Sequence, residues 1–209
     1  IETQFLRSSV VAHSLAEAAR RNSELRLIAI LPALPESLAF YDEDGLDTRF
    51  GLGLQRDAVR RIQDAFGERA TIASPVRPVM SSRDSLAVLS GSPMIYVHNK
   101  VLVKDDNYGL VGSGNLNGRS MHWDTEAAVE ITGPKRVHKM REKLLAHWWF
   151  DDLPPEAVQA DTLQPWWSKA IAENGVCLPE NRTGFLVPYD PDNQAELATS
   201  LPGITENIV

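Results

Sequence analysis

Residues Tyr96–Glu126 read YVHNKVLVKDDNYGLVGSGNLNGRSMHWDTE and carry the most informative pattern of the 209-residue chain. Two apolar runs, 94–104 and 108–112, flank the polar sequence Asp105-Asp106-Asn107, whose residue types favour a tight turn. Strand-forming runs on either side of such a turn predict a β-hairpin. A further strand is predicted over 125–131.

The first strand of this hairpin is predicted to carry two polar side chains on one face. His98 and Lys100 are two residues apart, and alternate residues of a strand point to the same side. Each needs a polar partner when half-buried, which makes the pair costly for packing alone. The returning strand leads into Gly112-Ser113-Gly114-Asn115, where the glycines let the backbone approach a ligand and the hydroxyl and amide can donate to phosphate oxygens. An imidazole, a cation and neutral donors are what cleavage of a phosphodiester requires.

These residues resemble the signature of the phospholipase D superfamily, which joins His-x-Lys-x(4)-Asp to a following Gly-Ser-x-Asn. The matching positions are His98, Lys100, Asp105, Gly112, Ser113 and Asn115. Glu126 lies where the family places a carboxylate that orients an active-site imidazole. The stretch 116–121, Leu-Asn-Gly-Arg-Ser-Met, is similar to the phospholipase branch rather than to the smaller nucleases.

The resemblance implies a role for each matching residue. His98 is expected to act as the general acid and base, with Lys100 and Glu126 completing the catalytic set. The phosphoryl oxygens are expected to be bound by Lys100, Ser113 and Asn115. A structural role is expected for Asp105, Gly112 and Gly114, with Asp105 bracing the hairpin. The resemblance implies no metal and no other cofactor.

The resemblance also implies that this chain is the C-terminal catalytic lobe of a two-lobed bacterial phospholipase D. The opening Ile1–Phe5 is similar to the first strand of that lobe, and the helix from Pro134 is similar to the closing helix of the family. In such enzymes a histidine of the N-terminal lobe forms a phosphohistidine, while the C-terminal histidine protonates the leaving alcohol and then activates water. This chain holds one such motif, because none of its other four histidines is followed by lysine two residues later.

Two sources of the second histidine stay open. One is a second polypeptide, the N-terminal half of the same precursor, and the other is an identical copy in a homodimer, as the small nucleases use. We expect the first, because the sequence is phospholipase-like and Ile1 falls inside the expected fold. The 209-residue chain by itself is then expected to be inactive and poorly soluble.

Three functions are compatible with the motif, and the charge helps to rank them. The chain has 21 Lys and Arg against 28 Asp and Glu, a net charge of −7, which disfavours a nucleic-acid partner. A phospholipase D that hydrolyses a phospholipid, or transfers its phosphatidyl group to another alcohol, is therefore favoured. The alternatives are a homodimeric phosphodiesterase or nuclease and a non-catalytic binding lobe. No apolar run approaches the ~18 residues of a membrane span, so we expect a soluble protein with peripheral membrane contact at most, cytoplasmic or secreted.

The remaining sequence predicts an α/β fold with a mixed sheet flanked by helices. Strands are predicted over 1–6, 25–31 and 70–73, helices over 9–21, 54–66, 134–148 and 161–173, and a loop over 36–51. Residues 1–150 are expected to form the catalytic lobe. Residues 151–209, with ten acidic and two basic side chains, are expected to form an irregular, acidic, Pro-rich extension. His122 and Trp123 are expected to pack against the protein.

Overall fold

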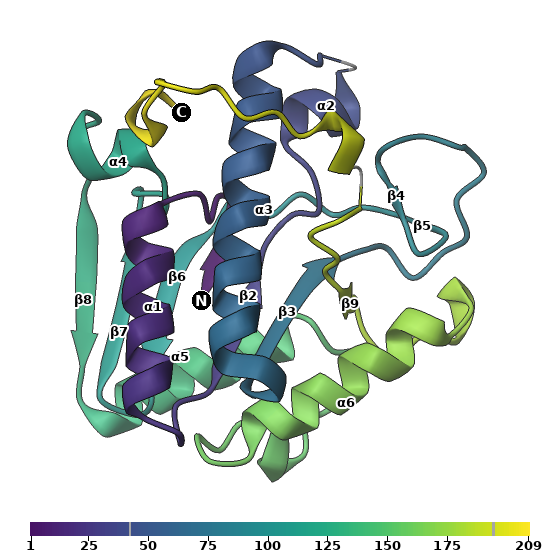
Figure 1. Ribbon diagram of the computed structural model, residues 1–209. Helices are drawn as coiled ribbons and strands as arrows, with labels where there is room; N and C mark the ends of the chain where they lie inside the picture. The colour runs from purple at the N-terminus through teal and green to yellow at the C-terminus, as the bar shows by residue number, and fades with distance from the viewer. Residues whose placement is uncertain (42, 194) are drawn as a thin grey trace.

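The computed structural model describes residues 1–41, 43–193 and 195–209. Within them lies a seven-stranded sheet with the order β8-β7-β6-β1-β2-β3-β9 (Figure 1). Its strands are β1 (Glu2–Thr3), β2 (Leu27–Ile30), β3 (Ala70–Pro75), β6 (Lys100–Lys104), β7 (Tyr108–Gly112), β8 (Ala128–Thr132) and β9 (Leu186–Pro188). β1, β2 and β3 are parallel, whereas β6, β7, β8 and β9 pair antiparallel with their neighbours. This mixed sheet confirms the predicted α/β class.

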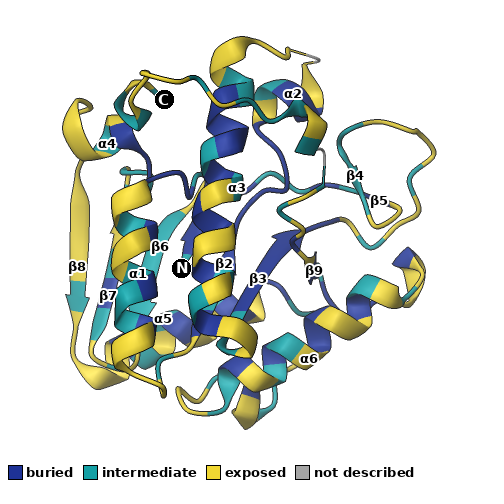
Figure 2. Ribbon diagram, in the orientation of Figure 1, coloured by how far each residue is buried: buried dark blue, intermediate teal, exposed yellow. Residues whose placement is uncertain are grey.

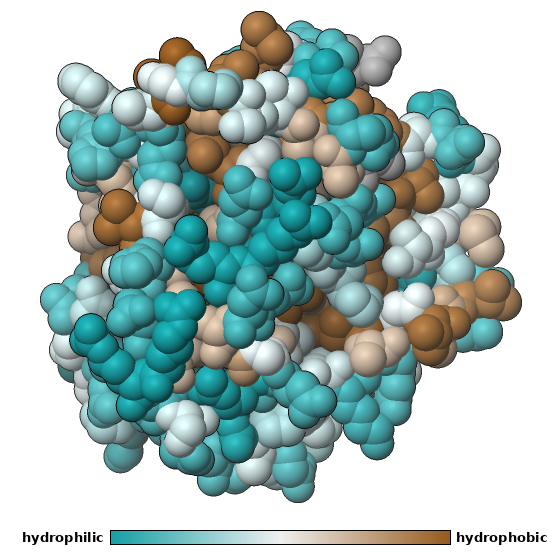
Figure 3. Space-filling model, in the orientation of Figure 1, coloured by the Kyte–Doolittle hydropathy of each residue, from teal (hydrophilic) through white to brown (hydrophobic). Residues whose placement is uncertain are grey.

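Helices cover both faces of the sheet. α1 (Ser9–Arg21) and α3 (Leu46–Phe66) lie on one face, and α5 (Pro134–Ala146) and α6 (Leu163–Val176) lie on the other (Figure 1). The strands β1, β2 and β3 are largely buried, whereas β8 at the sheet edge is largely exposed, as Figure 2 shows for β2, β3 and β8. The outer surface of the α1 and α3 layer is largely hydrophilic (Figure 3). Two short helices, α2 (Glu36–Phe40) and α4 (Gly118–His122), and a small β4–β5 pair (Val88–Leu89 and Ser92–Pro93) complete these elements. None of the described helices is both long and apolar enough to cross a bilayer.

Local sequence signals set the ends of three helices as predicted. The Ser8 side chain accepts a hydrogen bond from the backbone N–H of Val11 and so caps α1. α3 ends at Gly67, whose φ of +57° is the left-handed conformation that glycine adopts without strain. Pro134 is the first residue of α5, where its missing N–H has no helical partner to lose.

The predicted loop over 36–51 is wrong, because α2 and the first turns of α3 occupy most of it. Gly51 and the nearby Gly53 weaken the helical pattern, yet both lie at close contacts with distant segments. A Cβ on Gly51 would lie 2.6 Å from the Arg7 guanidinium, and one on Gly53 would lie 2.7 Å from the Thr199 carbonyl oxygen. Tertiary contacts therefore override the low helix propensity of glycine.

The predicted strand over 94–104 is also too long, because β6 begins at Lys100. Its neighbour β1 offers ladder partners for Lys100 and Val101 only. Asn99, just before the strand, instead donates a hydrogen bond from its side chain to the Glu2 carboxylate. His98 therefore lies in the extended segment that leads into β6, not within the strand as predicted.

Residues 151–209 are built into the same sheet and core as the rest of the chain. β9 pairs with β3 at the sheet edge, and α6 packs on β9 and β3. Trp167 and Leu186 from this segment lie in one buried cluster with Ile30 and Trp148. The boundary expected at residue 150 does not separate two packing units.

The turn between β6 and β7 is tied to α5 by Arg141, a buried residue. Its guanidinium donates to the backbone carbonyl of Asp105 and forms an ion pair of 2.8 Å with the Asp106 carboxylate. The Asp105 backbone has a φ of +50°, a conformation that Asp and Asn tolerate better than other residues with a Cβ. The contact of Asp105 with Arg141 is thus made by its backbone, and the side-chain contact comes from Asp106, so the bracing role expected for Asp105 stays a prediction.

We expect Asp105→Ala to lower the free energy of unfolding by about 1 kcal/mol, because alanine is strained in the left-handed conformation. Asp105→Asn, which suits this conformation, should remain close to the original protein in urea denaturation. Turnover per folded molecule should be largely kept in both variants. An Asp105→Ala protein with unchanged stability but lost turnover would contradict a structural role.

Candidate active site

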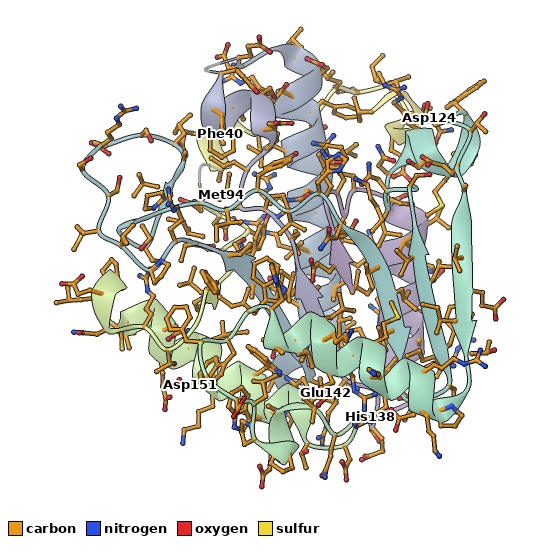
Figure 4. The ribbon with its side chains drawn as sticks, turned by 180° about the vertical axis from the view of Figure 1, so that it is seen from behind. Phe40, Met94, Asp124, His138, Glu142 and Asp151 are labelled. Carbon is orange, nitrogen blue, oxygen red and sulfur yellow. The ribbon has the colours of Figure 1, made fainter. Side chains whose placement is uncertain are left out.

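The two halves of the sequence motif meet at the end of the hairpin opposite its turn. Lys100 is the first residue of β6, and Ser113, Gly114 and Asn115 follow directly after β7. The pairing of Val101 with Val111 brings these two ends of the hairpin side by side. Figure 4 shows Asp124, which follows α4, at this end of the sheet and His138 of α5 at the other. Local hairpin geometry therefore assembles the predicted phosphate-binding residues.

A single glutamine oxygen joins the two halves. Lys100 Nζ donates to Gln4 Oε1 at 2.9 Å, and Asn115 Nδ2 donates to the same oxygen at 3.3 Å. Lys100 Nζ also donates to the backbone carbonyl of His98 at 2.7 Å. Gln4 itself is buried, and its Nε2 donates to the Tyr96 hydroxyl at 3.0 Å. The ammonium and the amide thus converge on one point beside the strand β1.

Burial lowers the pKa of the Lys100 ammonium below its ordinary value, while the negative charge of Glu126 opposes this shift. Both hydrogen-bond partners of the Lys100 ammonium are neutral oxygens, so no carboxylate neutralises its charge within these contacts. A charged donor of this kind forms strong hydrogen bonds with an anion. The group is therefore suited to binding a phosphoryl oxygen.

Glu126 contacts Ser113 rather than an imidazole. The Ser113 hydroxyl donates to the Glu126 carboxylate, and the backbone N–H of Ala127 donates to the same hydroxyl at 3.0 Å. Hydrogen bonds from Ser113 and Ser120 hold the pKa of the exposed Glu126 carboxyl below its ordinary value. Within the described contacts, Glu126 orients Ser113, and the role expected from the resemblance, orienting an imidazole, stays a prediction.

The His98 side chain is exposed and makes no hydrogen bond to any group that the structure describes. Its backbone is held on both sides, because Val97 is buried and Asn99 donates to Glu2. The Glu2 carboxylate is itself buried and accepts from Trp148 Nε1 at 3.0 Å. A carboxylate in the short strand β1 therefore fixes the segment that presents the imidazole.

The two motif glycines, Gly112 and Gly114, differ in how much space surrounds them. A Cβ on Gly112 would lie 2.9 Å from the Ala127 carbonyl oxygen and from Ala128 Cβ, so β8 requires glycine there. A Cβ on Gly114 would meet only the Glu126 side chain, at an ordinary 3.5 Å. Close packing thus supports the structural role expected for Gly112 but not that expected for Gly114.

Two cavities adjoin at the site. The first, of about 290 Å³, runs along β6 and β7 over Leu102 and Leu110, and we call it the apolar cavity. The second, of about 440 Å³, is lined by Gln4 and Tyr96 among others, and we call it the polar cavity. The residues that line both are Asn115, Ser120 and Glu126. A molecule held at Asn115 therefore has an apolar space on one side and a polar space on the other.

Trp123, expected to pack against the protein, is instead 73% exposed, and its neighbours His122 and Met121 are exposed with it. The short α4 stands at the end of the sheet, and the segment that follows it is exposed (Figure 2). Among the described residues, no group of three or more His, Cys, Asp or Glu is placed to hold a metal ion.

Gln4, Glu2 and Tyr96 carry site contacts that the sequence did not assign. Glu2 and Gln4 occur in the opening stretch that resembles a family strand, and polar residues in a short strand were the available signal. Gln4 is 96 residues from Lys100, so spacing within the motif could not reveal their contact.

We expect Gln4→Leu to lower kcat/KM about 10²-fold, because misplacement of a binding group by ~1 Å costs about that much. Gln4→Glu should raise the pKa of Lys100 and move any alkaline loss of activity to higher pH. Gln55 is the matched control, since it too is a buried glutamine bonded to a tyrosine hydroxyl, that of Tyr189, at 3.2 Å. Gln55→Leu should lower stability and leave the pH profile in place; identical profiles for all three variants would contradict a positioning role for Gln4.

Comparison with known proteins identifies the domain. Residues 60–156 match the family model described as Phospholipase D. The chain is 32% identical to Phospholipase D gamma 3 of Arabidopsis thaliana over 95 residues, which are 45% of this chain and 11% of that protein. It is 26% identical to Phospholipase D1 of Rattus norvegicus over 144 residues, 62% of this chain and 13% of that protein. The chain thus spans about a tenth of the length of these relatives.

A solved structure, NucT from Helicobacter pylori, aligns with 68% of this chain and 73% of its own, at a TM-score of 0.41 and 10% sequence identity. The matched residues 60–156 contain the whole motif from His98 to Glu126, and they belong to a domain of the phospholipase D superfamily.

Proposed function

We propose that this chain is the C-terminal catalytic lobe of a phospholipase D that cleaves the head-group phosphodiester of a glycerophospholipid. The observation that carries the proposal is the junction of the apolar and polar cavities at Asn115. A phospholipid has the same order of parts, with its phosphate between acyl chains and a polar head group. A nucleic-acid backbone has no apolar segment of that kind, so the junction favours a lipid.

The chemistry follows from the positions of the donors. Lys100, Ser113 and Asn115 would hold the phosphoryl oxygens, where charge accumulates in the transition state. The exposed His98 imidazole would protonate the leaving alcohol and afterwards take a proton from the attacking water. An alcohol in place of that water would give phosphatidyl transfer. These proton transfers and phosphate contacts use groups of this chain, whereas the bond to phosphorus that replaces the leaving alcohol must be formed by a second histidine.

A second histidine is needed to form the phosphohistidine, and we propose that it comes from a second lobe. The exposed His98 and Trp123 provide the surface over which such a lobe would dock. The N-terminal half of the same precursor is our first candidate, and a second copy of this chain is the alternative.

The proposal is tested by assaying the purified chain, alone and mixed with the N-terminal half, on a short-chain phosphatidylcholine. Choline release by the mixture, and none by the chain alone, is the expected result. An active symmetric dimer in light scattering would support the homodimer, and an active monomer would overturn the need for a second lobe. Nicking of plasmid DNA without choline release would favour a nuclease, and neither activity would favour a binding lobe.

A further inference from the structure

Arg7 is a buried cation that forms no ion pair with any of the described residues. The residue is only 7% exposed, and its guanidinium Nε has no hydrogen-bond partner among the described residues. The guanidinium lies over the Phe5 ring at 3.7 Å and fits against Gly51, where any side chain would collide with it. The fold thus makes room for this guanidinium, whose charge is offset only in part, by the Phe5 ring and by the more distant Asp47 carboxylate.

The Arg7 side chain lines the polar cavity, together with Tyr96 and the site residue Asn115. Burial lowers the pKa of Arg7 to about 10, so the group stays cationic at neutral pH. A buried charge without a partner is destabilising, because it loses its hydration and gains no counter-charge. Such a group is well placed to take its counter-ion from a molecule in the cavity.

The acidic side chains that line the polar cavity are exposed, and two of them are already engaged. Asp124 pairs with Arg119 at 2.9 Å, and Glu126 accepts from Ser113. Glu36 and Asp47 have no ion-pair partner among the described residues and lie in the solvent-exposed part of the lining. The cavity therefore presents a buried positive charge and an exposed negative rim.

We propose that the polar cavity selects a head group that carries both an ammonium and a carboxylate, as the serine of phosphatidylserine does. The carboxylate would bind the Arg7 guanidinium, whose planar donors suit a carboxylate. The ammonium would face Glu36 and Asp47, and the phosphate would lie at Asn115. This inference rests on the proposed function and adds a substrate class to it.

The test compares phosphatidylserine with phosphatidylethanolamine, which differ by that one carboxylate. With short-chain lipids and the active assembly, the original protein should prefer the serine lipid in kcat/KM. Arg7→Met should reduce the serine-to-ethanolamine ratio about 10- to 100-fold, as loss of a hydrogen-bonded charge contact does. Equal values of kcat/KM for the two lipids in the original protein, or an unchanged ratio in Arg7→Met, would overturn the inference.

Arg182 supplies the matched control. It is equally buried, but its three guanidinium nitrogens donate to Asn174, Ser92 and Ser90, and it does not line the polar cavity. Arg182→Met should lower stability and leave the serine-to-ethanolamine ratio unchanged. A ratio that falls equally in both variants would show a general effect of removing a buried arginine and would overturn the inference.

A binding measurement separates this inference from the proposed function. Glycerophosphoserine and glycerophosphoethanolamine can be titrated calorimetrically into the His98→Ala form of the assembly, which is not expected to hydrolyse them. Tighter binding of the serine compound, lost in Arg7→Met, would support the inference even if no lipid were turned over. Equal affinities, or no binding by either compound, would overturn it, whereas a failure of the proposed function would appear as absent head-group release from every lipid.

Discussion

Replacing His98 with alanine is expected to lower phosphodiester turnover by about 10²- to 10⁴-fold, the range that general acid–base catalysis contributes. The imidazole is exposed and makes no hydrogen bond to a described group, so its removal should leave the free energy of unfolding unchanged. The measurement is head-group release by the complete assembly, with urea denaturation of each protein in parallel. Retention of more than about a hundredth of the original rate would contradict the assignment.

The kind of substrate separates the acid role of His98 from other roles. A leaving group that departs as a stable anion, such as p-nitrophenolate, does not need to be protonated. His98→Ala should therefore lose much less activity in the first, bond-breaking step on a p-nitrophenyl phosphodiester than on a phospholipid. His13, an exposed histidine on α1, is the matched control, and His13→Ala should behave like the original protein on both substrates.

The hairpin and its motif could be predicted because their determinants are local. Turn residues, alternating strands and the Gly-Ser-Gly-Asn sequence all lie within 20 residues, roughly, of His98, and antiparallel pairing then brings Lys100 next to Asn115. Helix ends at Ser8, Gly67 and Pro134 are similarly local. Sequence patterns therefore predicted the α/β class, and they located the residues that are expected to bind phosphate.

The features that could not be predicted depend on contacts between distant segments. Gln4 reaches Lys100 and Asn115 across the sheet, and Glu2 meets Trp148 at the end of α5. The first turns of α3 contain Gly51 and Gly53, which pack closely against Arg7 and Thr199, and helix propensity does not reveal these contacts. The two cavities at Asn115 likewise depend on how α4 and the α2–α3 region surround the hairpin.

Replacing Lys100 with alanine is expected to lower kcat about 10²- to 10³-fold, as removal of one donor to a developing oxyanion does. The charge itself is what the phosphoryl group needs, and the Lys100 ammonium is held by hydrogen bonds to Gln4 Oε1 and to the His98 carbonyl. Lys100→Arg should restore the charge but only part of the rate, because a planar guanidinium does not replace a compact ammonium.

The pH dependence of binding gives Lys100 an independent signature. Only the protonated amine attracts a phosphodiester, and burial places the pKa of Lys100 below its ordinary value, so affinity should fall at a lower pH than for an ordinary lysine. Dimethyl phosphate keeps one charge throughout this range and is therefore a suitable ligand, measured on His98→Ala to remove the imidazole. In the double variant that carries both His98→Ala and Lys100→Arg, the fall in affinity at alkaline pH should disappear, because arginine stays protonated. If the same alkaline fall persisted in that double variant, the titrating group would have to be a residue other than Lys100.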